Sequence, residues 1–130
     1  MATWAEVQER VRVEYTLDHD ADDEFAITIE RRDEAGARAQ RVMVRRDVAW
    51  GGDLVEVRSA FAQFGDFDPK RLLEDSLQLP IGNVALHGRF LVVVQKQSLE
   101  HTTVDGVLYL IERVSLLADV LEERRGSDKF

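Results

Sequence analysis

The sequence contains no cysteine, and this absence removes several kinds of chemistry at once. Disulfide bonds, thiolate nucleophiles and zinc sites built on cysteine are all excluded. Proline occurs only twice in the 130 residues, and no stretch rich in proline, glycine or serine could join two domains. We therefore expect one domain over residues 1–126, followed by a frayed tail at residues 127–130.

Long hydrophobic runs are also missing. The longest are about five residues, such as Phe90 to Val94, whereas a membrane helix needs about 20. The start of the chain, Met1 to Glu6, lacks the basic and apolar regions of a secretory signal. A formal net charge of −8 opposes general attraction to a phosphate backbone. We predict a cytoplasmic protein in a reducing compartment, with no membrane contact and without nucleic acid as its usual partner.

The first residues carry a helix signal and a competing strand signal. Thr3 can cap a helix, and Glu6 completes a capping box. Apolar residues then follow at helical spacing, at Trp4, Val7, Val11 and Tyr15. The alternation expected of a strand is also present, at Val11, Val13, Tyr15 and Leu17. We predict a helix from Thr3 to about Tyr15, followed by an acidic connector from Asp18 to Glu24.

The rest of the chain alternates between strand and helix patterns. Period-two alternation predicts strands at 25–29, 42–44, 55–61, 83–86 and 90–95. A helix is expected from Asp68 and Pro69 until Pro80 stops it, and a long helix from Thr103 to about Arg125, closed by Gly126. The prediction is an α+β fold of order α-β-β-β-α-β-β-α, with an antiparallel sheet and the helices on one face.

The last predicted helix has more apolar surface than one core requires. Apolar residues over about half of its circumference would be enough to pack against one core. A second apolar stripe lies on the opposite side, at Tyr109, Leu116 and Val120. Exposing three such side chains would forgo roughly 1.5–3 kcal/mol of burial each. This stripe indicates a surface shared with a partner or a second subunit, unless the first helix covers it within the monomer.

The strand that contains Leu91 and Val93 is apolar on both faces. We expect helices to cover its other apolar residues, Phe90, Val92 and Val94. Two arrangements then remain for Leu91 and Val93. They are covered from the other side within the monomer, or they form a sheet face that binds a partner or an extended client.

The order helix, three strands, helix, two strands, helix resembles that of the class I type III secretion chaperones and the YbjN-like sensory-transduction regulators. The similarity is clearest in three segments: 72–77 (LLEDSL), 82–93 (GNVALHGRFLVV) and 110–122 (LIERVSLLADVLE). The resemblance implies a bacterial, chaperone-like protein that forms homodimers and binds a polypeptide client. The low isoelectric point, about 4.9, is similar to that of the family.

No residue set in the sequence indicates catalysis or a metal. The acidic connector has the start of a calcium-loop pattern, but Asp23 and Ile29 stand where that loop needs glycine and glutamate. The histidines lie in separate predicted loops or turns, at positions His19, His87 and His101. No nucleophile motif or phosphate-binding loop is present. We predict that the protein is not an enzyme and has no cofactor or metal.

Arginines concentrate on the first predicted hairpin, at Arg31, Arg32, Arg38, Arg41, Arg45 and Arg46. Near them in sequence only Asp33 and Glu34 oppose this charge. A nucleic-acid-linked regulator is therefore the alternative function, but a charged hairpin that discourages edge pairing is favoured. The leading hypothesis is a non-enzymatic protein-binding module, a homodimer with a polypeptide partner, whose partner or dimer interface includes Tyr109, Leu116, Val120, Leu91 and Val93.

Overall fold

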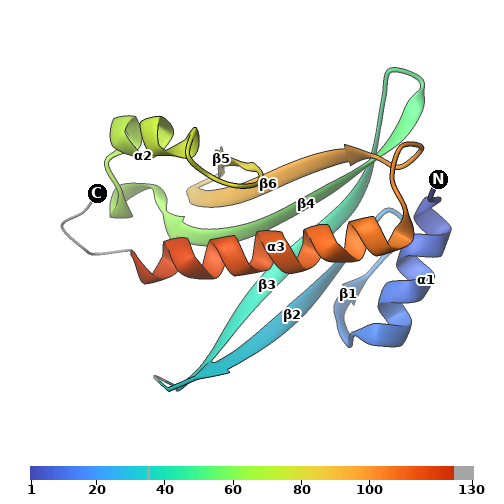
Figure 1. Ribbon diagram of the computed structural model, residues 1–130, viewed down its shortest axis with the longest axis horizontal. Helices are drawn as coiled ribbons and strands as arrows, with labels where there is room; N and C mark the ends of the chain where they lie inside the picture. Colours follow the sequence, from blue (N-terminus) through green and yellow to red (C-terminus); the bar gives the residue numbers. More distant parts are fainter. Residues whose placement is uncertain (35, 125–130) are drawn as a thin grey trace.

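The computed structural model describes residues 1–34 and 36–124, to which every structural statement below refers (Figure 1). In chain order the elements are α1 (Trp4–Glu14), β1 (Leu17–Asp20), β2 (Glu24–Asp33), β3 (Gly36–Ala49), β4 (Gly52–Gln63), a 3-10 turn (Phe64–Asp66), α2 (Pro69–Ser76), β5 (Asn83–His87), β6 (Phe90–Ser98) and α3 (Val104–Glu123). The strands form one antiparallel sheet in the order β1-β2-β3-β4-β6-β5. The α+β class is therefore confirmed.

Helix α1 forms where the capping box predicts it. The Thr3 hydroxyl accepts a hydrogen bond from the Glu6 amide at 3.2 Å, and the Glu6 carboxylate accepts one from the Thr3 amide at 3.0 Å. The helix ends at Glu14, so the competing strand interpretation of Val11 and Val13 is wrong. The predicted acidic connector is also partly wrong, because β1 occupies its first residues and pairs with β2.

One cluster of buried apolar side chains joins the sheet to α1, α2 and α3. Helix α3 crosses one face of the sheet, and α1 lies beside β1 and contacts α3 (Figure 1). The ring of Trp4 stacks on Phe25 of β2 with 5.4 Å between ring centroids, which fixes α1 against the sheet. On β2, β3 and β4 the residues that alternate toward the helices are also fully buried: Ile27, Val42, Val44, Val55 and Val57.

The turn between β3 and β4 contains an unfavourable residue. Trp50 and Gly51 have φ angles of 53° and 75°, which is the positive-φ pair of a type I′ turn. A β-carbon makes this conformation costly, and the Trp50 side chain gains no packing because it is 100% exposed. We expect Trp50→Asn to raise the free energy of unfolding by about 0.5–1 kcal/mol, measured by denaturant titration. A lower value would show that the tryptophan contributes contacts that outweigh the strain.

The last described residues belong to the end of α3. The helix runs to Glu123 with Arg124 at its C-cap. The predicted helix end at Arg125 and Gly126, and the predicted tail at 127–130, lie outside the described residues.

Candidate functional site

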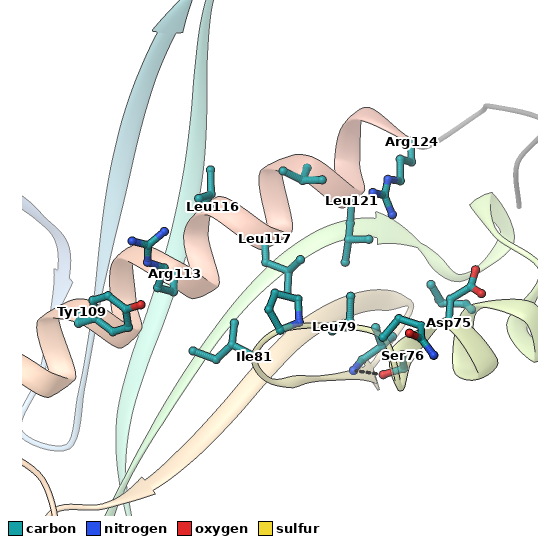
Figure 2. Close-up of a pocket in the computed structure, with 15 residues that line it drawn as sticks. Asp75, Ser76, Leu79, Ile81, Tyr109, Arg113, Leu116, Leu117, Leu121 and Arg124 are labelled. Atoms are coloured by element: carbon teal, nitrogen blue, oxygen red, sulfur yellow. Dashed lines mark hydrogen bonds between the residues drawn. The ribbon is translucent and has the colours of Figure 1, made fainter.

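A groove of about 710 Å³ separates α3 from the segment that connects α2 to β5 (Figure 2). Its volume lies within the range of about 300–1,000 Å³ typical of binding clefts. One wall comes from α3, with Tyr109, Arg113, Leu116, Leu117, Val120, Leu121 and Arg124. The opposite wall comes from α2, its following connection and β5, with Leu72, Asp75, Ser76, Gln78, Leu79, Pro80, Ile81 and Val84.

The α3 wall contains all three residues of the second stripe predicted from the sequence. Residues seven and eleven apart lie on the same side of a helix, so Tyr109, Leu116 and Val120 face the groove together. The side chains of Tyr109 and Leu116 remain 59% and 39% exposed. The first helix therefore does not cover this stripe. Its C-cap residue, Tyr15, instead donates a hydrogen bond to Glu112 at 2.6 Å. Burial and this bond together raise the pKa of the Tyr15 hydroxyl.

The opposite wall depends on a short helix and a turn with special geometry. Asp68 caps α2 by accepting a hydrogen bond from the Lys70 amide at 3.2 Å, with proline at the first helical position. After α2 the chain returns to the sheet through Gly82, whose φ is 70°. A β-carbon at this position would lie 3.0 Å from the carbonyl oxygen of Val94. Glycine therefore allows the connection to pack close to β6 and to form the groove wall.

Two cations and one anion line the otherwise mostly apolar groove. The guanidinium of Arg113 lies over the ring of Tyr109, 4.9 Å from its centroid. Arg124 stands at the other end of the α3 wall, and Asp75 is on the α2 side of that end (Figure 2). The groove thus carries a local positive excess in a chain whose formal net charge is −8.

Leu91 and Val93 do not form an exposed sheet face. Both belong to the core between sheet and helices, with exposures of 5% and 0%. Val93 pairs with Ser59 of β4, which is buried on the same face. The expectation that the helices cover Phe90, Val92 and Val94 is wrong, because these alternate to the opposite face. A run of five apolar residues has no alternation from which its inward face could be predicted.

Half of the hairpin arginines are bound to other parts of the domain. Arg38 forms ion pairs with Asp33, Asp119 and Glu123 at 2.8, 3.0 and 2.7 Å. Its hydrogen bonds to Asp119, with the surrounding negative charge, raise the pKa of the Arg38 guanidinium. The expectation that only residues of the hairpin oppose this charge is therefore wrong.

Two more arginines of this hairpin, Arg31 and Arg46, also contact other parts of the domain. Arg31 donates a hydrogen bond to the hydroxyl of Ser115 on α3 at 2.9 Å. Arg46 pairs with Asp23 at 3.5 Å and with Asp53 at 2.9 Å. These arginines attach the hairpin to its neighbours, which leaves less positive charge for binding nucleic acid.

Three acidic residues between α1 and β2 also make side-chain contacts within the domain: Asp18, Asp20 and Asp23. Arg12 binds the carboxylate of Asp20 at 2.8 Å, and this hydrogen bond lowers the pKa of Asp20. Asp18 accepts a hydrogen bond from the Thr28 hydroxyl. Within residues 1–34 and 36–124, no three histidine or acidic side chains are grouped as metal ligands.

Comparison with models of protein families finds no match to this chain, and comparison with curated proteins also finds none. None of the helices in the described part of the chain combines the length and the apolar character needed to cross a membrane.

The α2 side of the groove is the part that sequence reasoning missed. Leu79 and Ile81 lie in a connection, where no helical or strand periodicity marks a residue as facing a particular surface. The available signal was the apolar content of this connection, since three apolar residues surround the proline that ends the helix pattern: Leu77, Leu79 and Ile81.

Proposed function

We propose that this protein is a non-enzymatic protein-binding module, chaperone-like or regulatory, which holds a polypeptide segment in the groove between α3 and the α2–β5 connection. The observation that carries the proposal is the groove itself, in which partly exposed Tyr109 and Leu116 face an apolar wall. Water-exposed aromatic and leucine side chains that line one concave surface are typical of sites where a partner supplies the missing cover.

The groove chemistry favours binding over catalysis. Its aliphatic hydroxyl, on Ser76, accepts a hydrogen bond from the Val84 amide at 3.3 Å (Figure 2). None of the three histidines lines the groove, so no imidazole there could act as a general base for this serine. Most of the lining side chains are apolar, with fewer polar groups among them, as in the core of a protein–protein contact.

The same residues could join two copies of the chain, as the resemblance to dimeric secretion chaperones implies. A dimer formed through Tyr109, Leu116 and Val120 would bury α3 of each copy against the other. Light scattering separates the two forms of the proposal. If the groove is the dimer interface, the mass of the Leu116→Asp variant falls from dimer to monomer.

The proposal predicts that Leu116→Asp abolishes retention of a partner polypeptide. A carboxylate at this position puts a charge on the apolar part of the α3 wall, and a bound partner would have to desolvate it. The isolated fold tolerates the change because Leu116 is 39% exposed. The measurement is affinity capture from a native lysate with wild-type and variant proteins side by side. The polypeptide retained by wild type is expected to be lost from Leu116→Asp.

A matched control is Val13→Asp, which introduces the same carboxylate on α1 at a side chain that is 80% exposed and outside the groove. This variant is expected to retain the partner. Equal retention by all three proteins would place any binding surface elsewhere and contradict the groove assignment.

A further inference from the structure

Two arginines bracket the apolar part of the α3 wall. Arg113 precedes and Arg124 follows a cluster formed by Leu116, Leu117, Val120 and Leu121. The two arginines are eleven residues apart, which is about three helical turns or roughly 17 Å along the axis. At this spacing both guanidinium groups lie on the same side of α3. A ligand seated on the apolar cluster would therefore have a cation at each end.

Among residues 1–34 and 36–124, no carboxylate forms an ion pair with Arg113 or Arg124, and Arg113 contacts the Tyr109 ring. Five other arginines do pair with acidic side chains: Arg10, Arg12, Arg38, Arg46 and Arg58. Of these, Arg12, Arg38 and Arg46 each reach at least one carboxylate within 3.0 Å. In a chain with 25 acidic and 17 basic residues, two unpaired cations beside an apolar groove form a local field that complements acidic groups.

The groove walls present mainly side chains to an occupant, and strand β5 contributes only Val84 to them. One wall is the helix α3, whose interior amides are bonded within the helix. On the other wall, the Val84 amide of edge strand β5 already donates to Ser76 Oγ (Figure 2). An extended peptide that binds by adding a strand needs free backbone groups on a sheet edge. An amphipathic helix needs only an apolar groove, into which it places side chains at helical spacing.

We propose that the occupant is an acidic amphipathic helix of a partner protein. Its apolar side chains pack on the apolar cluster of the α3 wall, and its carboxylates pair with Arg113 and Arg124. This inference rests on the proposed polypeptide-binding function and specifies the partner class. Asp75 lies across the groove near Arg124 and partly offsets that charge. Arg113, which has no acidic side chain among the groove-lining residues at its end, is therefore the main determinant of charge preference.

The probe is a fluorescein-labelled helical peptide of about 18 residues, with leucines at positions i+3, i+4 and i+7 between glutamates at i and i+11. A second peptide carries lysine in place of both glutamates. Fluorescence anisotropy is expected to show at least about tenfold tighter binding of the glutamate peptide, with a preference that decreases as salt rises. The Arg113→Glu variant is expected to prefer the lysine peptide.

The control is Arg71→Glu, the same change of charge on α2 outside the groove. It is expected to keep the preference for the glutamate peptide, because its field at the groove is more strongly screened. Reversal of the preference in Arg71→Glu as well would assign the effect to overall charge and overturn the inference.

The outcomes separate this inference from the function on which it rests. Equal binding of both peptides, lost in Leu116→Asp, would overturn the charge preference and leave a polypeptide-binding groove. Binding of neither peptide, combined with groove-dependent capture of a partner, would overturn the helical occupant only. A dimeric mass that Arg113→Glu reduces to a monomer would make a second copy the occupant. Failure of the capture experiment itself would remove the proposed function.

Discussion

Replacing Val93 with aspartate is expected to lower the free energy of unfolding by about 4–8 kcal/mol. Val93 is 0% exposed in the core between the sheet and the helices. The change removes the burial of one valine side chain and places a carboxyl group within a cluster of buried apolar side chains. The loss is comparable with the whole stability of an ordinary domain, about 5–15 kcal/mol. Circular dichroism and denaturant titration would show a largely unfolded protein.

The adjacent residue supplies the control. Val94 alternates to the opposite face, is only partly buried, and is paired with Arg58 of β4. We expect Val94→Asp to fold with a much smaller loss, since its carboxylate can reach water and lies near a cation. If Val93→Asp folded as well as Val94→Asp, Val93 would lie on an accessible sheet face, and the client-binding interpretation of that residue would return.

The order of the elements could be predicted because local signals and tertiary packing agree over most of the chain. Thr3 and Glu6 mark the start of α1, and Asp68 with Pro69 marks the start of α2. The sequence carries no strand signal for β1, because Asp18 and Asp20 are typical of a solvated loop. Charged residues are common on short edge strands, which must avoid pairing with other molecules, and β1 is such a strand.

The length of β3 was underestimated for a related reason. Only the segment around Val42 and Val44 shows clear alternation, yet the strand covers the 14 residues Gly36–Ala49. Its first half contains Arg38 and Gln40, whose polar side chains face inward. Arg38 meets Asp119 of α3, and Gln40 donates a hydrogen bond to Ser59 at 2.9 Å. Polar residues that alternate toward buried polar partners cannot be distinguished by hydropathy from a loop.

Half of the candidate site followed from helical geometry. The stripe of Tyr109, Leu116 and Val120 depends only on the spacing of residues along one long helix, and all three line the groove. What faces them depends on where the α2–β5 connection crosses the sheet, and this is decided by packing at Gly82. The role of Arg113 likewise required the structure, because a sequence does not show which arginines find carboxylates within the fold.

Replacing Phe25 with alanine is expected to lower the free energy of unfolding by about 3–5 kcal/mol. The Phe25 side chain is 0% exposed and stacks on Trp4 with an interplanar angle of 28°. Its removal leaves a cavity under α1 and takes away the aromatic contact that fixes this helix on β2. The measurement is equilibrium unfolding in urea followed by tryptophan fluorescence, in which buried Trp4 changes its surroundings on unfolding while Trp50 is already fully exposed.

Leu73→Ala provides a comparison in a leucine that is 62% exposed on α2 and does not line the groove. This variant is expected to stay within about 0.5 kcal/mol of wild type. A loss below about 1 kcal/mol for Phe25→Ala would mean that α1 repacks readily against β2. Because α1 contacts α3 through Tyr15 and Glu112, a firmly fixed α1 also supports the helix whose other side forms the groove.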